Sequence, residues 1–255
     1  MQKQFIPGIY NYCDRWCERC TFTSRCRNYE STSKLTTEQL DINNKAFWEN
    51  ISSNFQKAIE LLYEAAAKHG FDLNQPMSNE EEIAYNERQS FIKTSAKEHP
   101  LAKRCKQYQR LVLPFVKQPD SGVAGKAQEL VDHLELGIIK EDHVVHTIAD
   151  INDCYEIIQW YVYFIDAKLQ RALHGKLEGE DWEEDNGYQK DSDGSAKIAL
   201  IAIEKSIAAW VRLYDLLPET DDIALKALAL LQQLQQQTKA EFPKAMQFKR
   251  PGFDA

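Results

Sequence analysis

The 255-residue chain carries a formal net charge of −8, is 43% hydrophobic and 27% charged, and contains only 10 glycines and 8 prolines. This composition is typical of a globular protein and excludes a fibrous or disordered chain. The acidic balance also argues against nonspecific nucleic-acid binding. No apolar run has the length of a signal peptide core or a membrane span, so we expect a cytoplasmic protein without membrane association. The sequence leaves its oligomeric state open.

The first expected unit is an N-terminal knob, residues 1–34. It contains four cysteines, Cys13, Cys17, Cys20 and Cys26, with the spacing C-x3-C-x2-C-x5-C. In a reducing compartment, clustered thiols are metal ligands or redox groups more often than disulfides. We therefore expect these four thiolates to bind one metal centre.

Two kinds of metal centre suit four thiolates. Zinc takes four such ligands in a tetrahedron, and a 4Fe-4S cluster is also held by four cysteines. Closed zinc sites usually pair two short cysteine knuckles across a longer loop, whereas no long loop separates these four cysteines. The spacing therefore favours a 4Fe-4S cluster, with zinc as the alternative.

A local resemblance supports the cluster. Cys17, Cys20 and Cys26 reproduce the C-x2-C-x5-C spacing of the iron-sulfur loop in endonuclease III-like DNA glycosylases, and the aromatic residue Tyr29 follows the last cysteine as it does there. The resemblance covers about 20 residues and implies a 4Fe-4S cluster at this loop. The interval before Cys17 is shorter than in that family, and no helix-hairpin-helix with a catalytic aspartate follows. The resemblance therefore implies the type of cluster and no glycosylase activity.

The first three cysteines alone have the C-x3-C-x2-C spacing of radical S-adenosylmethionine enzymes. Arg19 stands where those enzymes usually have an aromatic residue, and the chain lacks the strands of their partial barrel. Cys26 is available to close the fourth position on the metal. A closed site favours structure, sensing or electron transfer over substrate binding at the metal.

The N-terminal knob is mildly basic, with six basic residues against three acidic ones. Arg15, Arg19 and Arg25 lie between or beside the cysteines. We expect these arginines to balance the thiolate charge and to tune the centre. They also form a possible docking surface for a protein partner.

Residues 35–255 are expected to form an all-α, antiparallel bundle of six or seven helices. Thr36 with Gln39, Ser78, Ser195 and Thr220 have the pattern of N-caps, and Gly70 that of a left-handed helix end. The expected helices span about 36–69, 79–98, 100–117 with a kink or end at Pro114, 122–136, 141–174, 196–217 and 221–240.

An acidic loop, residues 178–194, is expected before the sixth of these helices. It contains eight acidic residues and one basic residue. Asp191 to Gly194 superficially resemble part of a calcium loop, but Leu200 occupies the position where the bidentate glutamate is required. We therefore expect a linker.

A second candidate site lies on the long helix from about residue 141. His143, His146, Asp150 and Asp153 follow one line along it, and Glu204 on a facing helix is a candidate partner. Such a group could bind a metal or form an acid-base pocket, which would make the protein an enzyme. The alternative is that this end of the helix simply faces solvent. No Glu-x-x-His pair of the di-iron bundle type occurs in the chain.

The same helix shows where the core should be. Its apolar residues at helical spacing form a core face, Ile148, Ile151, Tyr155, Ile158, Val162, Ile165 and Leu169. Cys105 and Cys154 lie singly within helices and are expected to be small buried apolar residues rather than ligands. Three classes of function remain open: a 4Fe-4S accessory protein, an enzyme with its site in the bundle, and a zinc-stabilised interaction module.

Overall fold

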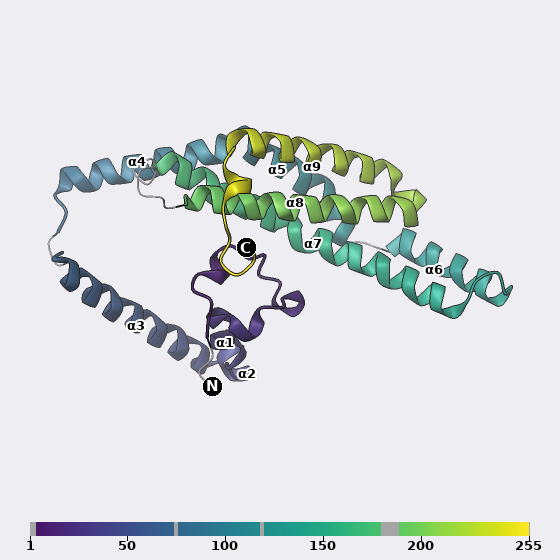
Figure 1. Cartoon of the computed structure of the whole chain (residues 1–255), viewed down its shortest axis with the longest axis horizontal. Coiled ribbons are helices and arrows are strands. Elements are labelled where there is room, and N and C mark those ends of the chain that lie inside the picture. The colour runs from purple at the N-terminus through teal and green to yellow at the C-terminus, as the bar shows by residue number, and fades with distance from the viewer. Residues whose placement is uncertain (1–3, 74–75, 118–119, 180–188, 255) are drawn as a thin grey trace. The chain divides into compact units, whose positions relative to one another are not determined.

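The structure, a computed structural model, describes residues 4–73, 76–117, 120–179 and 189–254 (Figure 1). The described part is helical throughout and contains no β-strand. Contacts divide the chain into two units, one made of residues 1–11 and 15–90 and the other of residues 12–14 and 91–255. Most of the N-terminal knob is thus grouped with the helices up to Ser90. The acidic residues 180–188 lie outside the described part.

The first unit contains short helices followed by one long helix. Its elements are η1 (Ile9–Asn11), η2 (Cys17–Arg19), η3 (Thr23–Arg25), α1 (Arg27–Ser33), α2 (Thr37–Leu40), α3 (Lys45–His69) and the first part of α4 (Asn79–Glu98). Gly70 ends α3 with a left-handed φ of 74°, which confirms the expected helix end. Ser78 and Glu81 exchange the hydrogen bonds of a capping box at the start of α4.

The prediction of one continuous helix from Thr36 is wrong. The capping box of Thr36 and Gln39 is present, but the helix that it begins ends at Leu40. The Asp41 carboxylate then accepts the backbone N–H of Asn43 at 2.9 Å, and the Asn44 side chain accepts the N–H of Ala46 at 3.0 Å. These local hydrogen bonds compete with the helical ladder and set a new cap at Asn44.

The second unit is built on four helices packed side by side (Figure 1). They are α5 (Pro100–Lys117), α7 (Glu141–Glu178), α8 (Asp191–Leu216) and α9 (Asp221–Glu241), while α6 (Asp120–Glu135) packs on α7. The short η5 (Pro218–Thr220) joins α8 to α9, and η6 (Ala245–Gln247) packs on α8. With α3 and α4, the described part has seven helices of 16 residues or more. None of its helices is both long and apolar enough to cross a bilayer.

Two further helix boundaries differ from the expected ones. The helix α5 ends at Lys117 with Pro114 inside it, within the expected span, whereas α7 continues past His174 to Glu178. The helix α8 begins at Asp191 rather than after a cap at Ser195. Ser195 is fully buried in the core, and the acidic residues before it suit the positive end of the helix dipole.

The core is centred on α8, which has more buried residues than any other helix in the described part. Four of its five alanines, at positions 196, 199, 202 and 209, are buried and allow neighbouring helices to approach closely. The predicted core face of α7 is confirmed at Ile151, Ile158, Val162, Ile165 and Leu169, which are at most 1% exposed.

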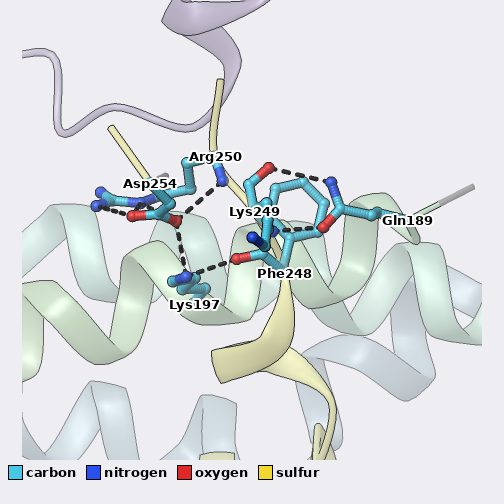
Figure 2. A network of polar contacts seen from close by, with 6 residues as sticks. All are labelled: Gln189, Lys197, Phe248, Lys249, Arg250 and Asp254. Atoms are coloured by element: carbon cyan, nitrogen blue, oxygen red, sulfur yellow. Dashed lines mark hydrogen bonds and ion pairs between the residues drawn. The ribbon is translucent and has the colours of Figure 1, made fainter. Parts of the chain in front are cut away.

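The C-terminal residues are held on α8 by polar contacts (Figure 2). The Lys197 ammonium donates to the Phe248 carbonyl at 2.5 Å and pairs with the Asp254 carboxylate at 2.7 Å. The Arg250 guanidinium pairs with the same carboxylate at 2.9 Å. The Lys197 side chain is only 10% exposed, so the pair compensates a charge that is largely removed from water.

We expect this C-terminal network to weaken in acid. The Arg250 guanidinium, assisted by Lys197, holds the pKa of the Asp254 carboxyl well below its usual value of about 3.9. Because the native pKa is lowered, the carboxylate stabilises the native state above about pH 4, and this contribution is lost as the pH falls further. Asp254→Asn should lower the free energy of unfolding in urea by roughly 1–3 kcal/mol at pH 7, and by less at pH 3.

The exposed pair Lys45–Glu49, 2.9 Å apart on α3, provides the control. Glu49→Gln should leave stability nearly unchanged at both pH values, because solvent screens an exposed pair. An Asp254→Asn effect of equal size at pH 7 and pH 3 would contradict the assigned role of the carboxylate.

Gly194 on α8 is a position where a side chain would be crowded by two aromatic rings. A Cβ atom there would lie 2.5 Å from the Tyr12 ring and 2.7 Å from the Phe248 ring. The Tyr12 ring cannot simply retreat, because its hydroxyl donates to Asp191 at 2.8 Å and its ring centroid lies 4.5 Å from that of Phe248. Gly194→Ala should gain about 1 kcal/mol of helix propensity and lose about 1–3 kcal/mol to overpacking. We therefore expect no net gain, and a loss of up to about 2 kcal/mol.

Gly125 on α6 is the matched control for this substitution. A Cβ atom there meets no other atom within 4 Å, so Gly125→Ala should stabilise the helix by about 1 kcal/mol. Thermal or urea unfolding of the two variants measures the difference. A stabilisation by Gly194→Ala as large as that by Gly125→Ala would show that the Tyr12 ring is not held against α8.

Candidate metal-binding segment

Residues 12 and 14, on either side of Cys13, are fixed to the second unit. The Asp14 carboxylate accepts hydrogen bonds from the Tyr161 hydroxyl at 2.7 Å and from the Lys205 ammonium at 2.9 Å. The Asp14 carbonyl accepts the indole N–H of Trp160 at 3.0 Å. Tyr161 is 1% exposed, so water is excluded from the Tyr161 side of the cluster formed by Asp14, Tyr161 and Lys205. Together with the Tyr12 contacts, these bonds hold the backbone of Cys13 against α7 and α8.

The other three cysteines occupy turns of the first unit. Cys17 begins η2, and the N–H of Cys20 closes that turn on the Cys17 carbonyl at 3.1 Å. Cys26 ends η3 and caps α1. All three side chains are half-buried.

Two of these sulfur atoms accept backbone hydrogen bonds. The N–H of Phe22 points to Cys20 Sγ at 3.4 Å, and the N–H of Tyr29 points to Cys26 Sγ at 3.5 Å. Backbone N–H groups thus point at two of the four predicted ligand atoms. Hydrogen bonds to the sulfurs are also one of the factors that set a cluster's reduction potential.

The thiols are chemically suited to a metal, but their side chains do not yet form a complete ligand sphere. None of the four is in a disulfide. Within the described ranges, no three histidine, cysteine or carboxylate side chains lie close enough together to hold one ion. Metal binding would therefore have to draw the thiols inward, which is common where binding and local folding are coupled.

Cys105 and Cys154 differ clearly from these four, as expected. Both are buried, with exposed fractions of 2% and 4%. Burial raises the pKa of the Cys105 thiol far above its usual range and that of Cys154 to about 11. Both thiols therefore stay protonated at neutral pH, which confirms that they are small core residues.

The arginines of the segment lie at the surface. Arg15, Arg19 and Arg25 are exposed. The Arg19 guanidinium lies 3.9 Å from the centre of the Trp16 ring, a cation–π distance. Arg15 has a φ of 59°, a left-handed conformation that is uncommon for a residue other than glycine. The segment thus presents positive charge to solvent beside the cysteines.

The second candidate group does not come together as a pocket in the described part of the chain. His143, His146 and Asp153 are exposed on α7. Asp150 is paired with Arg212 of α8 at 2.5 Å. Glu204 is exposed and accepts a hydrogen bond from Gln235 of α9 at 3.2 Å. The geometry of the described side chains therefore adds no support to this hypothesis.

Sequence reasoning missed the cluster of Asp14, Tyr161 and Lys205. Its members come from three distant parts of the chain. An acidic residue beside a predicted ligand is the only signal the sequence offers, and it does not identify the partners.

No protein-family model, curated protein or solved structure matches this chain.

Proposed function

We propose that the four-cysteine segment, residues 13–26, binds a 4Fe-4S cluster and that the protein serves in electron transfer, sensing or partner docking. An antiparallel helical bundle would carry the metal-binding N-terminal knob. Cys17, Cys20 and Cys26 would supply three thiolates, and Cys13 would supply the fourth by its place in the sequence. When bound, such a cluster accepts and releases single electrons.

The observation that carries this proposal is the pair of backbone N–H groups directed at Cys20 Sγ and Cys26 Sγ. A buried apolar cysteine needs no such donors, whereas a thiolate is stabilised by them. The bonds of Asp14 to α7 and α8 add a second argument. They hold the backbone beside Cys13, so less conformational entropy would be lost on ligation.

The surface around the segment supports docking of an acidic protein. Arg15, Arg19 and Arg25 are exposed within a chain whose net charge is −8. Opposite charge across an interface raises the association rate and orients the partner. Electron transfer and docking are compatible, since a redox partner has to bind briefly beside the centre.

The deciding experiment is purification without oxygen, followed by the visible absorption spectrum and by quantification of iron, zinc and sulfide on the same sample. Broad visible absorption with about four irons and four sulfides per chain is the expected result. A colourless protein with about one zinc would replace the cluster by a structural zinc site and favour the interaction module. A protein that holds neither metal would overturn the proposal.

A further inference from the structure

The helix α3 presents a broad apolar face that its own unit leaves exposed. At 100° per residue, its large apolar side chains from Phe47 to Tyr63, with the exception of Leu61, fall within an arc of about 160°. Trp48 is 55% exposed, Phe55 67% and Leu62 56%. Ala66 is the only α3 residue among those described that is buried. The three lysines and three glutamates of α3 all lie outside the central part of this arc.

The exposed apolar area is close to what one partner contributes to a stable interface. Taking roughly 200 Å² for each large side chain, the exposed fractions of Trp48, Phe55, Ile59, Leu62 and Tyr63 correspond to about 550 Å². The half-buried Phe47 and Ile51 and the alanines add to this area. The largest apolar patch of a typical monomer is about 300–600 Å², and a standard interface buries about 800 Å² per partner.

The pattern within this face is that of a coiled-coil seam. Trp48, Ile51, Phe55, Ala58, Leu62 and Ala65 alternate at spacings of three and four residues. Ile51, Asn54, Phe55 and Ala58 line a depression of about 360 Å³. Their spacing of i, i+3, i+4 and i+7 is that of the hole which receives a side chain of a facing helix.

The sizes along the seam favour a particular pairing. Along the seam, the large residues Trp48, Phe55 and Leu62 alternate with the smaller residues Ile51, Ala58 and Ala65. In an antiparallel pair of identical helices, the large residues of one copy face the small residues of the other. One register then matches every position: Trp48 faces Ala65, Ile51 faces Leu62 and Phe55 faces Ala58. A parallel pair would place Trp48 on Trp48 and alanine on alanine, which leaves bulges and gaps.

We propose that the apolar face of α3 binds α3 of a second copy of this chain in this antiparallel register. The interface is isologous, because each contact occurs twice about a two-fold axis between Phe55 and Ala58. The charges on α3 balance, with three lysines against three glutamates, so two copies do not repel each other. The proposal does not depend on the metal centre.

The first test measures the molar mass of the full chain by light scattering at increasing concentration, in the presence of a reducing agent. The measured molar mass of the native protein should approach twice that of one chain as the concentration rises. Phe55→Glu should raise the dissociation constant of the dimer by at least about 30-fold, because it buries an unpaired charge at the interface. Ser53→Glu puts the same charge on the opposite face of α3 and should have little effect.

Circular dichroism serves as the folding control: both variants should remain helical, because Phe55 is exposed within its own chain. A native protein that stays monomeric would overturn the proposal. A dimer that Phe55→Glu leaves intact would also overturn it, because the interface would then lie elsewhere.

The second test addresses the register. Phe55→Glu and Ala58→Lys should each weaken the dimer alone. Mixed together, they should restore a heterodimer, because the new glutamate of one copy faces the new lysine of the other, and the remaining Phe55 faces the remaining Ala58. A parallel pair cannot show this rescue, since position 55 would face position 55. Failure of the mixture to recover the dimer would overturn the antiparallel register.

Discussion

Replacing Trp210 by alanine is expected to lower the free energy of unfolding by about 3–5 kcal/mol. Trp210 is 0% exposed at the centre of the second unit. Its indole N–H donates to the Tyr108 hydroxyl at 3.0 Å, and its ring lies 5.2 Å from that of Phe115. The alanine variant would leave a large cavity between α5 and α8, and the surrounding helices can collapse into it only partly.

Two further variants separate the sources of this loss. Trp210→Phe keeps most of the ring volume but removes the donor to Tyr108, which should cost roughly 1–3 kcal/mol. Tyr214→Ala, one turn later on α8 at a site that is 39% exposed, should cost clearly less than Trp210→Ala. Urea unfolding at pH 7 measures all three. Equal losses for Trp210→Ala and Tyr214→Ala would contradict the assignment of Trp210 to the core.

The second large effect concerns metal content. We expect Cys20→Ala to reduce the iron bound after anaerobic purification from about four atoms per chain to less than one, since a cluster of this kind needs its cysteine ligands. Helix content should not change, because Cys20 lies in a turn outside the packed helices of the second unit. Elemental analysis and circular dichroism on the same samples provide both measurements.

Cys154→Ala is the control for this experiment. Cys154 is 4% exposed, its thiol has a raised pKa of about 11, and its removal should leave the metal content unchanged. If Cys20→Ala retained the metal of the native protein, Cys20 would not be a ligand and the four-cysteine assignment would fail. The same comparison with Cys13→Ala tests the fourth ligand, which was assigned from sequence spacing alone.

Much of the helical structure could be predicted because its signals are local. Caps at Ser78 and Thr36, the end of α3 at Gly70 and the start of α7 at Glu141 depend on residues within one turn of each other. The predicted helix boundaries are wrong where two local signals compete. Asp41 and Asn44 interrupt an otherwise helical pattern, and Asp191 begins α8 although Ser195 is also a good N-cap residue.

For the candidate site, the sequence predicts a chemistry but not the surroundings, and the metal centre stays a prediction. Four thiols within 14 residues indicate a metal centre, because few other uses require such a cluster. The sequence could not show that Asp14 is bound by Tyr161 and Lys205, since these residues are 147 and 191 positions away. Nor could it show that Asp150 pairs with Arg212 rather than with His146.

The sequence by itself therefore determined the helical class, most helix ends and the buried face of α7. All of these follow from contacts between residues that are close along the chain. Only the tertiary structure decided that α8 is the central helix, that the backbone beside Cys13 is fixed to it, and that α3 keeps its apolar face exposed. These features depend on which distant surfaces meet, and a periodic pattern specifies an apolar face without specifying its partner.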